Sequence, residues 1–180
     1  LMDRIGGIVM LHIPRALRLR DLINLHQMME IDEKYPNAKV IIAHIGRAYV
    51  PEDLGNAFDT LKNSKHLYFD FSANCSKDAM EALFTNIGTE RIMFGSDMPF
   101  TCMRMYRIDD GGKYVNVVPR GLYGGVDSDP HMRESDEKNI TTFKYEELLA
   151  LRATAEKLGL DRADIEKIMH GNAARLFGID

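Results

Sequence analysis

The chain has 180 residues, a formal net charge of −4, 45% hydrophobic residues and 28% charged residues. This length predicts one domain with one buried core, and the composition is typical of a globular protein rather than a disordered or fibrous one. The weakly acidic charge, without a long basic run, argues against nucleic acids and anionic membranes as partners.

The first half of the chain alternates apolar runs with helical patterns. An apolar run spans residues 7–12, and apolar side chains then recur at helical spacing over residues 19–35. A second run spans residues 39–44 and precedes a helix that we predict from about Pro51, because proline is favoured in the first turn of a helix.

The alternation continues with two further apolar runs. Residues 67–73 form the third run, and Ser76 is the predicted N-cap of the helix that follows. Residues 91–97 form the fourth run. Continuous apolar strands that alternate with amphipathic helices indicate βαβ units, so we predict an α/β fold with a parallel sheet buried on both faces.

Residues 98–142 interrupt this rhythm. The segment 105–117 has two strand-like arms around Asp-Asp-Gly-Gly, which predicts a hairpin within a long, polar insertion. Helices are expected again over residues 145–158 and from Asp161, where Asp164 three residues later is typical of a capped start. We therefore expect a single domain over residues 1–180, with an insertion at 98–142 and C-terminal helices at 143–180.

The sequence gives no indication of a membrane span or of a disulfide bond. No apolar stretch approaches the ~18 residues that a membrane span needs. Cys75 and Cys102 lie far apart and form no CxxC pattern. Free thiols are typical of a reducing compartment, so the sequence predicts a cytoplasmic protein.

Three of the four predicted strands end in a side chain that can bind a metal: His12, His44 and Asp97. In a parallel sheet the carboxyl ends of the strands share one edge, where catalytic groups of α/β proteins collect. The separations of 32 and 53 residues correspond to about one and two βα units. Two imidazoles and one carboxylate suit Zn²⁺, which lowers the pKa of a bound water toward ~7.

Other interpretations of these residues stay open. Without a metal, a histidine and an acid can act as general acid and base, and each residue taken alone is more commonly structural. Arg15 and Arg47 each follow a strand-end histidine by three residues, so they are candidates for binding an acidic substrate. Asp70, inside its strand, is either a polar group of the same edge or a hydrogen-bonded structural acid.

Four motifs stand in this order along the chain: VMLHIPR, VIIAHIGR, RIMFGSDMPF and the closing GNAARLFGI. Together they resemble the amidohydrolase superfamily, in particular its amidohydrolase-related group of TIM-barrel metal-dependent hydrolases and decarboxylases. The resemblance implies that the four runs are strands five to eight of a (β/α)₈ barrel. It also implies one divalent ion, usually zinc and sometimes manganese.

The resemblance implies roles for the three strand-end residues. His12 matches the fifth-strand metal ligand. His44 matches the sixth-strand histidine, which binds a second metal or polarises the substrate. Asp97 matches the eighth-strand aspartate, which binds metal and accepts a proton from the attacking water.

One family motif has no counterpart. The first-strand H-x-H or E-x-H pair is missing, and a full barrel takes ~250 residues. We therefore expect a C-terminal half-barrel that is either part of a longer chain or completed by another segment. An isolated half-barrel leaves strand edges unpaired, so we expect a homo-oligomer or association with an N-terminal half.

Three functions follow from these observations. The first is a metal-dependent hydrolase, in which an activated water attacks a C–O or C–N bond of a small, acidic substrate. The second is a non-oxidative decarboxylase of the same family group. The third is an inactive half-barrel or interaction domain, which the missing first-strand histidines favour.

Overall fold

The computed structural model describes residues 1–14 and 16–179. Its central sheet is four-stranded, entirely parallel and ordered β1-β2-β3-β4. The strands are β1 (Ile8–Leu11), β2 (Lys39–Ile42), β3 (Leu67–Asp70) and β4 (Ile92–Met93). Each strand lies within one of the four apolar runs, so the predicted α/β fold with a parallel sheet is confirmed.

Both faces of the parallel sheet are apolar. Val40, Ile42 and Phe69 pack in one large cluster with residues of α2 (Leu22–Lys34), α5 (Ala57–Leu61) and α6 (Lys77–Ile87). On the alternate face, Ile41 and Met93 pack against Leu176 near the C-terminus. This alternation explains why the strands are continuous apolar runs rather than half-polar ones.

The helices begin where capping groups stand. The Asp21 side chain accepts hydrogen bonds from the first turn of α2, and Ser76 Oγ accepts from Ala79 N at 3.3 Å, which confirms the predicted cap of α6. The helix expected from Pro51 is divided at Gly55, where φ is +48°. The short elements of this part are α1 (Met2–Ile5), η1 (Arg18–Arg20), α4 (Pro51–Leu54) and α5.

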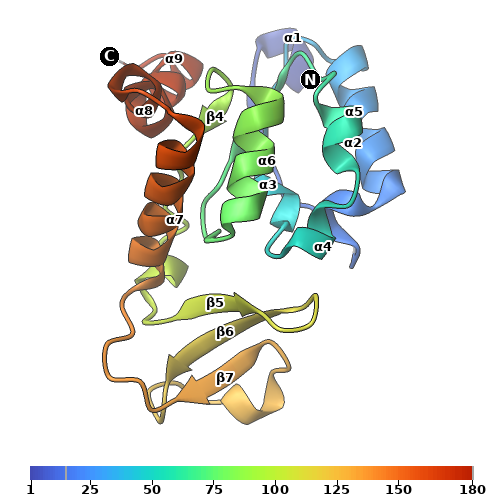
Figure 1. The fold of residues 1–180 in the computed structure, drawn as a ribbon. Helices are drawn as coiled ribbons and strands as arrows, with labels where there is room; N and C mark the ends of the chain where they lie inside the picture. The colour runs from blue at the N-terminus through green and yellow to red at the C-terminus, as the bar shows by residue number, and fades with distance from the viewer. Residues whose placement is uncertain (15, 180) are drawn as a thin grey trace.

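The C-terminal helices pack along β4 and α6 (Figure 1). They are α7 (Phe143–Leu158), α8 (Arg162–Glu166), a π-helical turn η4 (Lys167–Gly171) and α9 (Asn172–Phe177). Asp161 and Asp164 form a capping box at the start of α8, as the sequence predicts. Asn172 is fully buried and donates to the carbonyl oxygens of Thr89 and Ile92, both at 2.6 Å.

A second, three-stranded sheet lies below the parallel sheet in the view of Figure 1. It comprises β5 (Tyr106–Asp109), β6 (Tyr114–Pro119) and β7 (Met132–Ser135), with short helices η2 (Phe100–Cys102) and η3 (Val126–Ser128) nearby. β5 and β6 are antiparallel, which confirms the predicted hairpin, whereas β6 and β7 are parallel.

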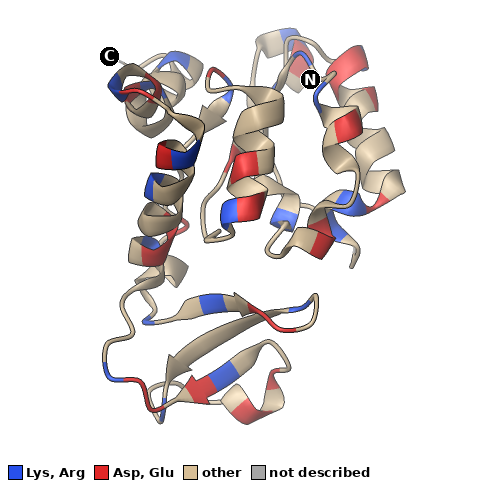
Figure 2. Cartoon of the chain, in the orientation of Figure 1, with Lys and Arg blue, Asp and Glu red and all other residues tan. Residues whose placement is uncertain are grey.

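Charged side chains of both signs are mixed along the helices and in the second sheet (Figure 2). Several of them form i,i+4 pairs, such as Arg152 with Glu156 and Arg162 with Glu166. Cys75 and Cys102 are both free, as predicted. In the described part of the chain, no helix has the length and apolar character needed to cross a bilayer.

Candidate active site

Two histidines meet at the carboxyl ends of β1 and β2. His12 follows β1 directly, and His44 opens the turn labelled α3 (His44–Arg47). Their Nε2 atoms lie 2.7 Å apart, with His44 buried and His12 exposed. The strands are paired in parallel and Ala43 N donates to Leu11 O, so the two strand ends bring the imidazoles together, as the sequence predicts.

Residues at the end of β3 orient the His44 ring. Nδ1 of His44 lies 2.9 Å from both the carbonyl oxygen and Oγ of Ser72. Because a carbonyl only accepts, we assign the proton to Nδ1, which leaves a bare lone pair on Nε2. Oδ1 of Asp70 accepts from Ser72 Oγ at 2.6 Å and from His44 N at 2.9 Å. Asp70 is thus a buried, hydrogen-bonded acid that acts on the site through Ser72 and His44.

Left-handed backbone conformations gather at this edge. His44, Ala73 and Asp97 have φ of 56°, 49° and 45°, and they follow the ends of β2, β3 and β4 respectively. All of α3 is a left-handed turn, with positive φ at each of its four residues. Such conformations cost roughly 1–2 kcal/mol per non-glycine residue. Backbone strain of this kind clusters at active sites, which supports a functional role for the edge.

Asp97 is half-buried in the loop after β4. The segment after β4 lies close to the segment after β3, as Gly95 shows: a Cβ added there would lie 3.1 Å from Cβ of Ser72. Over residues 1–14 and 16–179, however, no three His, Cys, Asp or Glu side chains are grouped so that they could hold a metal ion. The structure therefore joins His12 to His44 but does not gather Asp97 with them.

Of the two arginines expected to bind substrate, Arg47 lies within the described residues. Arg47 is half-buried in α3, and its Nη1 donates to Ile13 O at 3.2 Å, which ties the turn after β2 to the segment after β1. Arg15 lies outside the described residues. Its role stays a prediction.

Glu147, on α7, is an acid of this region that the sequence did not reveal. Its side chain is fully buried, Oε2 accepts from Ala73 N at 3.3 Å, and Oε1 has no hydrogen-bond partner in the described structure. Burial raises the pKa of Glu147 to about 8, with smaller upward contributions from Asp70 and Asp97, while the Ala73 N–H acts in the opposite direction. Glu147 thus retains a proton at neutral pH. Glutamate at a helical position gives no sequence signal of this burial, because the contact with Ala73 spans 74 residues.

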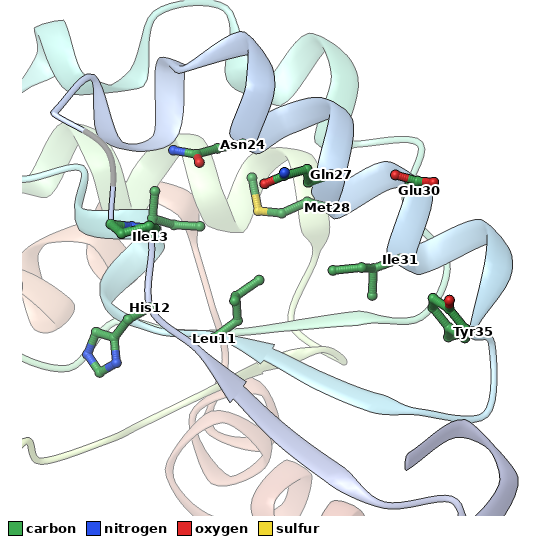
Figure 3. A pocket seen from close by; sticks show the side chains of 10 residues that line it. Leu11, His12, Ile13, Asn24, Gln27, Met28, Glu30, Ile31 and Tyr35 are labelled. Carbon is green, nitrogen blue, oxygen red and sulfur yellow. The ribbon is translucent and has the colours of Figure 1, made fainter. Parts of the chain in front are cut away.

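A cavity of about 320 Å³ opens beside His12, between β1 and α2. Figure 3 shows Leu11, Met28 and Ile31 around it, while the imidazole of His12 points away from them. We therefore assign the cavity to the flank of β1 rather than to the histidine pair. Its lining residues are Leu11, His12, Ile13, Pro14, Asn24, Gln27, Met28, Glu30, Ile31 and Tyr35.

The donor atoms present fit part of a metal shell. The bare Nε2 of His44 and Nε2 of His12 face each other, and neutral imidazole nitrogen is a preferred ligand of zinc. The Asp70–Ser72 pair fixes the tautomer of His44 in the way that outer partners of metal-binding histidines do. At 2.7 Å the two atoms are hydrogen-bonded, with Nε2–H of His12 donating to the bare Nε2 of His44. Both nitrogens could bind one metal ion only after His12 moves its proton to Nδ1 and the two rings separate, and further ligands are needed to complete the shell.

Comparison with known proteins gives a family and a fold. A family model described as Amidohydrolase matches residues 2–111, which is more than half of the chain. Among curated proteins, no sequence matches significantly.

Solved structures resemble nearly the whole chain at low identity. An amidohydrolase from Burkholderia multivorans with bound zinc matches with a TM-score of 0.64 and 13% identity, over 99% of this chain and 55% of its own. An amidohydrolase 2 from Bifidobacterium longum subsp. infantis matches with a TM-score of 0.54 and 17% identity, over 99% of this chain and 52% of its own. A 5-carboxyvanillate decarboxylase from Sphingomonas paucimobilis matches with a TM-score of 0.52 and 14% identity, over 99% of this chain and 51% of its own. The chain thus spans about half the length of these proteins.

Proposed function

The chain belongs to the amidohydrolase family, and from this premise we propose that it carries part of the active site of a metal-dependent hydrolase. The reaction is attack of water on a C–O or C–N bond of a small, acidic substrate. The observation that carries this proposal is the 2.7 Å approach of the two Nε2 atoms of His12 and His44, at the edge where β1 and β2 end.

Each residue of the site has a role in this proposal. His12, His44 and Asp97 are the proposed ligands of a divalent ion, zinc by preference and manganese as the alternative. A bound ion of this kind supplies Lewis acidity and lowers the pKa of water toward neutrality. Asp97 accepts the proton that the attacking water loses. As the alternative to binding metal, His44 polarises the substrate carbonyl, which needs a proton on Nε2 rather than a bare nitrogen there. Arg15 and Arg47 orient the acidic group of the substrate.

The architecture proposed for the whole protein is a (β/α)₈ barrel in which β1 to β4 are strands five to eight. The three-stranded sheet belongs to an insertion at residues 98–142 that covers the site. β1 pairs with β2 on one side only, and an apolar groove with Leu1, Val9, Leu11 and Val40 in its lining runs beside it. We propose that an N-terminal half-barrel, or a second copy of the chain, covers this edge. A cytoplasmic location agrees with the free thiols of Cys75 and Cys102.

Non-oxidative decarboxylation is the second candidate. Loss of CO₂ leaves a carbon that must be protonated, and Glu147 is a carboxyl group that keeps its proton at neutral pH, one hydrogen bond from Ala73 at the edge. Assays of lactone or amide hydrolysis against CO₂ release from the same acidic substrates separate the two reactions.

Zinc binding tests the site directly. The purified chain is loaded with zinc, and its content is measured by mass spectrometry with affinity measured by calorimetry. We expect about one zinc per chain, lost in His12→Ala, His44→Ala and Asp97→Ala. His26→Ala is the matched control, because His26 is exposed on α2. Absence of stoichiometric zinc, or equal binding in all four variants, would contradict the proposal and favour an inactive or interaction domain.

A further inference from the structure

Two arginines share two tyrosine rings at the same edge of the parallel sheet. The guanidinium carbon of Arg107, on β5, lies 4.1 Å from the ring centroid of Tyr49 and 5.0 Å from that of Tyr114. The guanidinium carbon of Arg18 lies 5.3 and 4.6 Å from the same two centroids. The rings are in edge contact, with centroids 5.1 Å apart. Two positive charges are therefore held over one pair of aromatic rings.

Only one of these charges has an anionic partner in the described chain. Arg18 pairs with Asp53, Nη1 to Oδ2, at 2.7 Å. Arg107 forms no ion pair with a described Asp or Glu. Its Nε donates to Asn116 Oδ1 and its Nη1 to Ala73 O, both at 2.9 Å, while its Nη2 has no hydrogen-bond partner there. Guanidinium has five donor hydrogens, so several remain free.

The surroundings of Arg107 make an uncompensated charge costly. Burial lowers the pKa of Arg107, and the positive charge of Arg18 lowers it further. Arginine nevertheless stays protonated in proteins, so the charge persists. A charge held away from water is stabilised when an anion pairs with it. Arg107 is half-buried, and it lines a cavity of about 490 Å³ together with Lys77, Glu137 and Glu146, among other residues.

The position of Arg107 connects it to the histidine pair. The carbonyl that it binds belongs to Ala73, the residue after Ser72, and Ser72 holds Nδ1 of His44. Tyr49 comes from the loop after β2, five residues beyond His44. The β5–β6 hairpin thus extends a free guanidinium edge to the loops that carry the candidate active site.

We propose that Arg107, with Tyr49 and Tyr114, forms a binding site for a carboxylate group of the substrate, which makes Arg107 a specificity-determining residue. The inference rests on the proposed function, since it places this group beside the reacting one. A planar carboxylate matches the fork of a guanidinium with two parallel hydrogen bonds.

Binding of a matched pair of probes tests the inference. Benzoate and benzamide have nearly the same shape, but only benzoate is an anion. Calorimetry on the full chain is expected to show benzoate binding at least about tenfold more tightly than benzamide. In Arg107→Gln this preference is lost, whereas Arg152→Gln, an exposed arginine on α7, keeps it. Equal binding of the two probes to the unmodified chain would overturn the inference, as would benzoate binding unchanged in Arg107→Gln.

Two further measurements, one on a second variant and one with a second anion, separate the remaining explanations. If Arg107→Gln does not fold, as judged by thermal unfolding, Arg107→Lys keeps the charge and loses the fork. Benzoate affinity is then expected to fall about tenfold, and an unchanged affinity overturns the inference. Inorganic phosphate must compete with benzoate only weakly, because stronger phosphate binding assigns the site to a different anion. None of these measurements needs a metal, so they are made on the metal-free chain, and the two proposals can fail separately.

Discussion

Nε2 of His12 lies 2.7 Å from Nε2 of His44, although 32 residues separate the two side chains along the sequence. The approach depends on parallel pairing of β1 with β2, which places residues just past Leu11 and Ile42 at one edge. The His44 ring is buried and Ser72 holds its Nδ1, whereas the His12 ring is exposed. Hydrogen bonds from Asp70 through Ser72 to Nδ1 fix the orientation of the His44 ring, and Nε2 is then directed at His12.

Removing the Ser72 hydroxyl is expected to make the orientation of the His44 ring less fixed. In Ser72→Ala, Nδ1 of His44 keeps the carbonyl oxygen but loses Oγ, and Asp70 loses its 2.6 Å donor. Outer partners of metal-binding histidines are worth about 10- to 100-fold in metal affinity, so we expect zinc affinity to fall by about tenfold or more. Calorimetry measures this, with Ser128→Ala as control because Ser128 is exposed and bonds only to Gly125 O. Equal zinc affinity in both variants would show that the hydroxyl does not position His44.

Glu147 predicts a loss of stability with rising pH. Its pKa in the folded chain is about 8 rather than 4.5, so the folded chain binds more protons than the unfolded chain between these values. The free energy of unfolding therefore decreases as pH rises from about 4.5 to 8, by up to ~5 kcal/mol, and stays low above pH 8. Urea unfolding at pH 5 and pH 9 measures the difference.

The variant Glu147→Gln isolates this contribution. Glutamine resembles the protonated acid, so the variant should match the unmodified chain at pH 5 and exceed it in stability by several kcal/mol at pH 9. Glu156→Gln, an exposed change on the same helix, should leave the pH dependence as it is. The assignment is wrong if Glu147→Gln keeps the full decrease between pH 5 and pH 9.

The sequence predicts the fold and the histidine pair because both depend on local pattern and on simple spacing. Apolar runs identify β1 to β4, and parallel strands then bring His12 and His44 to one edge. Ser72 also stands just past a strand, but a serine there carries no signal of chemistry. Glu147 lies on α7, and strand spacing does not predict that α7 packs against Ala73 after β3.

Arg107 shows a second reason for the gap between sequence and structure. Its environment is made by Tyr49 from the loop after β2 and by Phe143 at the start of α7, whose ring centroid lies 4.7 Å from the guanidinium carbon. Hydrophobic periodicity predicts a hairpin at residues 105–117, but it does not predict onto which loops the hairpin packs. The direction in which a side chain of the hairpin points is therefore a tertiary property.

Gly46 is expected to be intolerant of a side chain. It has φ of +59° within the left-handed turn of α3, and a Cβ there would lie well inside van der Waals contact with Cδ1 of Leu19. Left-handed strain and overpacking together predict a loss of roughly 2–4 kcal/mol of unfolding free energy in Gly46→Ala. Gly124→Ala is the matched control, because no atom lies within 4 Å of its added Cβ. Urea midpoints compare the two variants, and similar midpoints would refute the packing argument.

Asn172 is expected to hold the C-terminal helices to β4. Its Nδ2 donates to the carbonyl oxygens of Thr89 and Ile92, both at 2.6 Å, from a fully buried position in α9. Asn172→Ala removes both hydrogen bonds and leaves carbonyl groups without a donor, so we expect a loss of roughly 2–4 kcal/mol in unfolding free energy. Asn63→Ala provides the comparison, since Asn63 is exposed and its side chain donates to Asp59 O, four residues earlier in the chain. Because Phe94 N also donates to Ile168 O at 2.8 Å, hydrogen exchange at Phe94 should quicken in Asn172→Ala and not in Asn63→Ala. Unchanged exchange at Phe94 would mean that the helices dock on β4 through apolar contacts alone.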